Sequence, residues 1–299
     1  MMGMRSRAIV ALSILAVTPA LGWAQSGSPP KVPAAPVISP CESFFQLLAY
    51  TDMPDLKKKY GIAPARVFGA QDFWPKGDPR ETVPSEPGVA KGLDLRPPNG
   101  GPIVLDIEHW PQRGTQAEVT STVDRLLGLL ATVRRIEPGV NIGYYGIPPI
   151  RDYWRAIRGP GDAQYEEWVR DNDRLARLAQ SVNVLFPSLY TFYDDPAGWR
   201  KYAVANLKEA RRLAGSKRIY AFLWPQYHES NKQLGGQYVA ASYWRSQLET
   251  VAEHADGVLL WGGWASPGIR AKWDESAGWW VETKRFIETR NAGPCRQPG

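Results

Sequence analysis

The sequence is poor in the side chains that hold metal ions or act as nucleophiles. It has two cysteines and three histidines among 299 residues. The histidines, His109, His228 and His254, are far apart along the chain, and neither cysteine has a neighbouring Cys or His. This composition disfavours a histidine-based metal centre, a Ser-His-Asp triad and a cysteine nucleophile. We therefore expect no metal and no cofactor.

Motifs for nucleotides and nucleic acids are missing as well. No GxGxxG or GxxxxGK[ST] motif opens an expected helix, which disfavours a dinucleotide or P-loop site. There is no helix-turn-helix, zinc-finger or RNP pattern, and Lys and Arg are spread along the expected helices, so nucleic acid is not an expected partner. The net charge of +6, about two lower without Arg5 and Arg7, favours an anionic polymer.

Long apolar runs are absent after the N-terminus, so no later segment is expected to cross a bilayer. At the N-terminus, Arg5 and Arg7 precede the apolar run 8–17, and a small-residue site follows at 22–24. The pattern predicts a secretory signal peptide over residues 1–24, with an uncleaved membrane anchor as the alternative. We expect a secreted or periplasmic protein without membrane contact after cleavage.

The next segment, 25–40, is rich in Pro, Ser and Ala and is expected to be a disordered linker. A single folded domain is then expected over 41–299. Its ends carry Cys41 and Cys295, which in an exported protein predicts a disulfide between them, with two free thiols as the alternative. Loop entropy alone would give such a bridge ~5 kcal/mol.

Short apolar runs alternate with amphipathic segments from residue 100 onward. We expect strands at 103–107, 141–145, 184–190, 218–223 and 257–261, with a possible first strand at 66–70. Helices are expected at 117–136, 165–181, 196–214, 238–254 and about 279–289. This repeated βαβ order predicts an α/β fold, a (β/α) TIM-like barrel that is distorted or has fewer than eight regular strands. An open doubly wound sheet is the alternative.

Two acids, Asp106 and Glu108, stand at the end of the apolar strand 103–107. Alternate residues of a strand share a face, so their Cα atoms lie ~7 Å apart on one side. Two carboxylates ~5 Å apart repel by roughly 3 kcal/mol, about two pKa units, at an effective dielectric of about 20. One of them then tends to keep a proton, as a general acid requires. A strand end running into a solvated loop is the alternative.

The expected strand ends also carry aromatic residues. These candidates for substrate binding are Trp110, Tyr145, Tyr190, Tyr220, Trp224 and Trp261. In a barrel the strand ends meet at one site. Rings can cover the apolar faces of sugars while hydroxyl groups reach their polar edges. Chance is the alternative, because the chain has 13 Trp and 13 Tyr.

These residues resemble the hyaluronidases of glycoside hydrolase family 56. The family motif Asp-x-Glu-x-Trp matches 106–110, and its Gly-aromatic-Tyr-Gly-aromatic-Pro stretch is similar to 143–148. Its Asn-Asp-x-Leu helix resembles 172–175, and the Leu-Tyr-Pro-Ser-Ile-Tyr strand that follows resembles 185–190. A late Gly-Val-Val-Leu-Trp strand is similar to 257–261. The blocks occur in the family's order.

The resemblance implies a distorted barrel and endo-hydrolysis of β-linked N-acetylhexosaminides, by an endo-β-N-acetylhexosaminidase that acts with retention and without a cofactor. Glu108 would be the acid and base, and Asp106 would orient the substrate acetamido group, which acts as the nucleophile. Sugar contacts are implied for Tyr145, Tyr190, Tyr220 and Trp261. The implied partner is a polysaccharide such as an anionic glycosaminoglycan, bound by a monomer.

The sequence also departs from the family pattern. Pro111 follows Trp110 directly, where the family has Arg-Pro, and Arg151 stands in a loop where the family has an acid and a Tyr. The stretch 224–226 lacks the family's further Asp. These differences concern substrate contacts and weaken the case for hyaluronan itself. A non-catalytic carbohydrate-binding protein on a degenerate barrel and a muramidase-like cell-wall hydrolase remain as alternatives.

Overall fold

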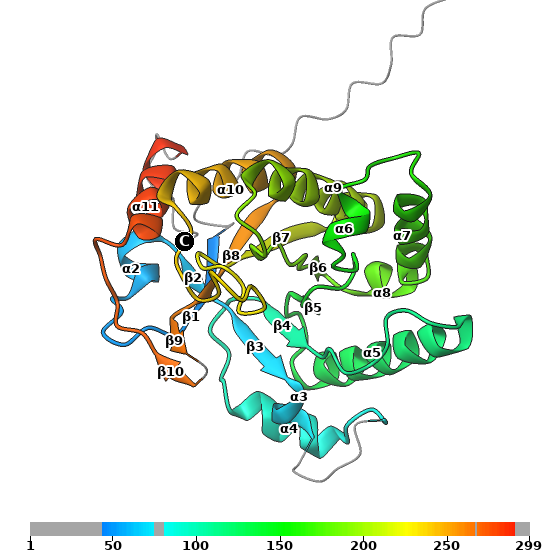
Figure 1. Cartoon of the computed structure of the whole chain (residues 1–299). Helices are drawn as coiled ribbons and strands as arrows, with labels where there is room; N and C mark the ends of the chain where they lie inside the picture. Colours follow the sequence, from blue (N-terminus) through cyan, green and yellow to red (C-terminus); the bar gives the residue numbers. More distant parts are fainter. Residues whose placement is uncertain (1–43, 75–80, 267, 291–299) are drawn as a thin grey trace, which may run out of the picture. The chain divides into compact units, whose positions relative to one another are not determined.

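A computed structural model describes residues 44–74, 81–266 and 268–290 (Figure 1). The predicted signal peptide and linker lie outside these ranges, as do Cys41 and Cys295. Export and the disulfide therefore stay predictions. Among the described helices, none combines the length and the apolar composition that crossing a membrane requires.

The described chain alternates strands and helices. The strands are β1 (Phe44–Leu48), β2 (Ala63–Pro64), β3 (Arg66–Gly69), β4 (Ile103–Asp106), β5 (Ile142–Tyr144), β6 (Val184–Leu185), β7 (Arg218–Leu223), β8 (Gly257–Gly262), β9 (Trp264–Ser266) and β10 (Ile269–Arg270). The helices are α2 (Leu56–Tyr60), α3 (Ala70–Phe73), α4 (Glu86–Asp94), α5 (Gln116–Ile136), α6 (Tyr153–Ala156), α7 (Ala163–Asp173), α8 (Ala176–Ser181), α9 (Pro196–Ala214), α10 (Ala241–His254) and α11 (Gly278–Arg290).

The strands pair in parallel, as the sequence predicts. One sheet has the order β2-β1-β8-β7-β6 and another the order β3-β4-β5, while β9 and β10 form an antiparallel hairpin. Several contacts connect the parallel sheets, among them these two: Ala65, between β2 and β3, donates its N–H to the carbonyl of Gln46 at 2.9 Å, and Tyr145 bridges to Phe186. The prediction of an α/β fold with parallel sheets is confirmed.

The expected elements differ from the observed ones in several places. Strand β1 is not among the expected strands, because its five residues are too few to show a period; it is held between β2 and β8. The expected strand 184–190 is regular only over β6 and continues through isolated bridges. The expected helix 165–181 is two helices, α7 and α8, since Leu175 N–H turns to the carbonyl of Asn172 at 3.0 Å.

The helices bury apolar faces against the strands. In α5, five buried residues recur at helical spacing: Val119, Val123, Leu126, Leu130 and Val133. A capping box opens this helix, with Thr115 N–H donating to Glu118 Oε2 at 2.7 Å. Helices α9 and α10 contact β7 and β8 (Figure 1). The indoles of Trp279 and Trp280 are buried, so these residues pack in the core.

Gly143 sets the distance between β5 and β6. A Cβ atom at this position would overlap the carbonyl oxygen of Val184 and lie 3.1 Å from the ring of Phe186. The two strands therefore approach too closely for any side chain. This approach places Tyr145, two residues further on, beside the segment that follows β6.

Replacing Gly143 with Ala should destabilise the fold by about 2–3 kcal/mol, because a backbone carbonyl cannot move aside as a side chain can. For a domain of this size the melting temperature should fall by roughly 4–12 °C. Gly128→Ala is the matched control: its Cβ would lie 3.2 Å from a side-chain methyl group of Val83, and Ala favours a helix. We expect a change within about 1 kcal/mol. Equal losses in the two variants, in thermal unfolding, would contradict this account.

Candidate active site

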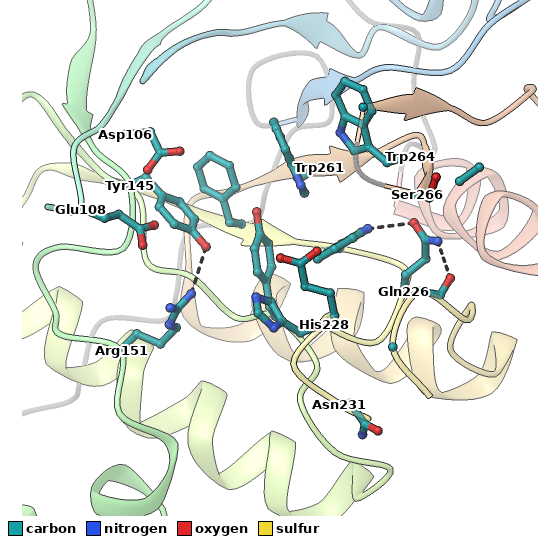
Figure 2. A pocket seen from close by; sticks show the side chains of 18 of the residues that line it. Asp106, Glu108, Tyr145, Arg151, Gln226, His228, Asn231, Trp261, Trp264 and Ser266 are labelled. Atoms are coloured by element: carbon teal, nitrogen blue, oxygen red, sulfur yellow. Dashed lines mark hydrogen bonds between the residues drawn. The ribbon is translucent and has the colours of Figure 1, made fainter. Parts of the chain in front are cut away.

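A cavity of about 930 Å³ lies at the carboxyl ends of the strands (Figure 2). Its lining includes six of the eight predicted catalytic and substrate-binding residues, namely Asp106, Glu108, Tyr145, Tyr190, Trp224 and Trp261. They come from the end of β4, the residues after β5, β6 and β7, and β8. Parallel strands with their carboxyl ends at one edge bring such distant residues together.

The predicted substrate contact at Tyr220 is corrected by the structure, because this residue does not line the cavity. It lies on β7 two residues before Phe222, which does line it. Alternate residues share a face, so Tyr220 points the same way but lies about 7 Å further from the strand end. Its ring packs against Phe45 and Phe186, with centroids 4.9 and 6.3 Å away. Tyr220 is therefore a core residue beneath the site.

Trp110 lies beside the main cavity. Its buried indole packs edge-on against Trp74, with centroids 5.7 Å apart. It lines a smaller pocket of about 380 Å³, whose lining shares Glu108, Tyr145 and Arg151 with the main cavity. Trp110 is thus near the acid pair but separate from the other predicted sugar contacts.

The two acids face each other in the cavity. Asp106 is half-buried at the end of β4, and Glu108 is exposed to the cavity. Burial raises the pKa of Asp106 to about 7, the negative charge of Glu108 and a hydrogen bond between the two carboxyl groups act in the same direction, and the charge of Arg151 acts against them. The pair therefore holds a proton near neutral pH.

The two acids differ in burial. The resemblance assigns the acid role to Glu108, and in the free protein burial raises the pKa of Asp106. The strand end shields Asp106 from water and leaves Glu108 exposed, and desolvation penalises the charged form of the shielded group.

Tyr145 and Tyr190 stand beside the acids. The hydroxyl of Tyr145 lies 3.0 Å from Ser188 Oγ and accepts a hydrogen bond from Arg151 Nη1 at 3.3 Å (Figure 2). Its ring centroid is 5.8 Å from that of Tyr190. Burial raises the pKa of Tyr145 to about 12 and also raises that of Tyr190. Both are neutral phenols that can donate hydrogen bonds near pH 7.

Tryptophans line the rest of the cavity. The indole of Trp224 meets Tyr190 edge-on at 5.3 Å and donates to Gln226 Oε1 at 2.9 Å. Trp261 on β8 and Trp264 on β9 are half-buried and present rings to the cavity (Figure 2). Flat apolar surfaces beside hydrogen-bonding groups suit a sugar chain.

Sequence reasoning missed several lining residues. Arg151, Phe222, Gln226 and His228 line the cavity. Three of them lie in loops, where no periodicity indicates which way a side chain points. The available signal was their position a few residues after an expected strand. Within the described ranges, no group of three His, Cys, Asp or Glu side chains is arranged to hold a metal ion.

Comparison with known proteins adds a family resemblance. No protein-family model matches the chain. Curated relatives include hyaluronidases from Polybia paulista, 25% identical over 167 residues that make up 52% of this chain, and from Apis mellifera, 26% identical over 155 residues and 48%. The chain is hyaluronidase-like. The matches span 56% and 38% of these relatives, so the chain spans about half of their length or less.

Solved structures agree on the fold of this hyaluronidase-like chain. Bee venom hyaluronidase matches with a TM-score of 0.54 at 16% identity, over 83% of this chain and 96% of that one. The same enzyme in complex with a hyaluronic acid tetramer matches with a TM-score of 0.52 at 15% identity. The resemblance seen in the motifs is confirmed by the curated relatives, and the likeness of fold covers more of the chain than the matched sequence segments do.

Asp106→Asn should stabilise the protein, and more so at high pH. The unfolded aspartate ionises near pH 3.8 and the folded one near 7, so the folded state binds more protons between these values and wild-type stability falls as pH rises. The Asn variant has no carboxyl group at this position, so it does not lose stability in this way as pH rises. Its advantage in the free energy of unfolding should be small at pH 4 and reach about 4 kcal/mol at pH 8, roughly 8–16 °C in melting temperature. Thermal unfolding at the two pH values measures it, and an equal difference at both would contradict the shift.

Proposed function

We propose that the protein is a glycoside hydrolase that cleaves β-linked N-acetylhexosaminides within a glycosaminoglycan of the hyaluronan type. The observation that carries the proposal is the proton-holding pair Asp106 and Glu108 at the edge of a cavity lined by tyrosine and tryptophan. The named relatives are hyaluronidases, and one similar structure holds a hyaluronic acid tetramer, which supports this substrate class.

We also infer that the parallel strands close into a distorted (β/α) barrel. The pairings run from β6 through β7, β8 and β1 to β2, and from β3 through β4 to β5. The contacts Ala65–Gln46 and Tyr145–Phe186 stand at the two junctions between these sheets. A closed barrel accounts for both junctions and for the gathering of strand ends around one cavity.

In this proposal the two acids take different roles when the substrate binds. Asp106 turns to the N–H of the sugar acetamido group and loses its proton to Glu108 across their hydrogen bond. Glu108 then protonates the leaving oxygen, and the acetamido oxygen attacks the anomeric carbon as the glycosidic bond breaks. Water opens the resulting cyclic intermediate with Glu108 as base, which returns the proton and retains the anomeric configuration.

The neutral phenols of the two tyrosines in the cavity stabilise the same intermediate. Tyr145 and Tyr190 lie together beside the acids, where they can donate hydrogen bonds to the acetamido group and stabilise the charge that develops on it. Trp261 would form the floor under the sugar, and Trp224 a side wall. Phe222, whose ring meets that of Tyr145 edge-on with centroids 4.9 Å apart, adds an apolar surface that sequence reasoning did not include.

Glu108→Gln should reduce the release of reducing ends from hyaluronan by at least 10²–10⁴-fold, because the amide cannot protonate the leaving oxygen. The variant should keep the wild-type fold and still bind the polymer. Glu288→Gln, at an exposed position on α11, is the matched control and should stay within about twofold. A Glu108 variant as active as the wild type would refute the assignment.

The same assay separates the alternatives when hyaluronan, chondroitin and peptidoglycan are offered side by side and their products sized. Binding without any cleavage would favour the carbohydrate-binding protein. The departures from the family pattern at Arg151 and 224–226 support that alternative. Cleavage of peptidoglycan alone would favour the muramidase-like hydrolase. Cleavage of hyaluronan or chondroitin is the result that we expect.

We propose from the sequence that export removes residues 1–24 and that Cys41 pairs with Cys295. The mass of the secreted protein should then correspond to a chain starting at Gln25. Alkylation without reductant should leave the mass unchanged, and alkylation after reduction should add two modifying groups. Two modifications before reduction would contradict the bridge.

A further inference from the structure

Arg151 is a cation in the cavity that no acid neutralises directly. Its half-buried side chain lines the cavity, its Nη1 donates to the hydroxyl of Tyr145 at 3.3 Å, and its guanidinium lies 5.5 Å from the ring centroid of Phe192. Among the described residues, no carboxylate lies within salt-bridge distance of it. Glu108 acts on it only from further away.

Two other shielded arginines of this protein are paired with acids. Buried Arg66 donates to Glu137 Oε1 at 2.8 Å, and Arg155 reaches Asp152 at 2.7 Å and Asp171 at 2.9 Å. Removing a charge from water is unfavourable unless a partner compensates for it. Arg151 lines the cavity without such a partner among the described residues, so an anionic group of the ligand can supply one.

His228 stands next to Arg151 on the same aromatic ring. Its imidazole centroid is 4.7 Å from that of Phe192, the ring over which Arg151 also lies. Its Nδ1 accepts the N–H of Ser230 at 3.1 Å, so the neutral ring carries its proton on Nε2. That nitrogen has no hydrogen-bond partner among the described residues, and the side chain lines the cavity.

We propose that Arg151 and His228 form a carboxylate subsite that binds a uronic acid unit of the polymer beside the cleaved hexosamine. The inference rests on the proposed function and extends it to substrate choice. A planar guanidinium edge fits the two oxygens of a carboxylate, and the Nε2–H of His228 supplies a further donor. The position also solves an electrostatic problem: a sugar carboxylate near Asp106 and Glu108 would be repelled without a cation between them.

The test compares hyaluronan with hyaluronan whose uronate carboxyls have been reduced to alcohols. Arg151→Gln should lower kcat/KM for hyaluronan, mainly through KM, by about 10–100-fold more than it lowers kcat/KM for the reduced polymer, because any effect through Tyr145 or the acid pair is common to both polymers. Arg151→Lys keeps the positive charge but lacks the planar guanidinium that binds two carboxylate oxygens. Its kcat/KM for hyaluronan should lie between those of the wild type and Arg151→Gln. Arg158→Gln removes the same charge at an exposed position outside the cavity and should leave both substrates unchanged.

The outcomes are distinguishable. Equal losses on both polymers would mean that Arg151 serves Tyr145 or the acid pair, and would overturn the inference while the proposed function stands. A wild type that cleaves the reduced polymer as well as hyaluronan would overturn it too. If the wild type cleaves neither polymer, the proposed function fails, and calorimetry with a hyaluronan tetrasaccharide decides about the subsite. Equal affinities of wild type and Arg151→Gln would then refute it.

Discussion

Two carboxyl groups held against each other at the end of β4 are the constraint on which the rest of the site depends. Asp106 is shielded by the sheet that it terminates and cannot easily carry a charge beside Glu108. A proton is therefore kept close to neutral pH, where an ordinary aspartic acid would have lost it. The neighbouring groups act on the same site. The charge of Arg151 limits how far the pKa of Asp106 rises, and Tyr145 and Tyr190 stay neutral hydrogen-bond donors.

The fold supplies this arrangement through close contacts between parallel strands. The absence of a side chain at Gly143 lets β5 approach β6, so that Tyr145 reaches Ser188 across the gap. Tyr190 follows the same chain segment and meets Trp224 from the end of β7. The site is thus assembled from strand ends whose backbones are fixed by buried sheet pairing. Loops add Arg151 and His228 to this rigid frame.

What the sequence predicts well is what strand periodicity determines. Asp106 and Glu108 share a face because one residue, Ile107, separates them, and the aromatic residues at strand ends lie around one cavity because the strand ends meet there. Periodicity does not show how far a residue lies from the carboxyl end of its strand. Tyr220 therefore lies too far from that end to line the cavity, and Trp110 lines a separate, smaller pocket. The raised pKa of Asp106 depends on burial by other strands, which no local pattern reveals. Loop residues such as Arg151 carry no periodic signal, and β1 is too short to show one.

The central claim is a proton retained by the pair at neutral pH, and infrared difference spectroscopy of the carboxyl groups tests it directly. The spectrum of the wild type minus that of Asp106→Asn should contain a protonated-carboxyl band that titrates with a midpoint near pH 7. The same band should be absent from Asp106→Asn at every pH above 5. A wild-type band that disappears by pH 5, as for an ordinary aspartic acid, would contradict the account.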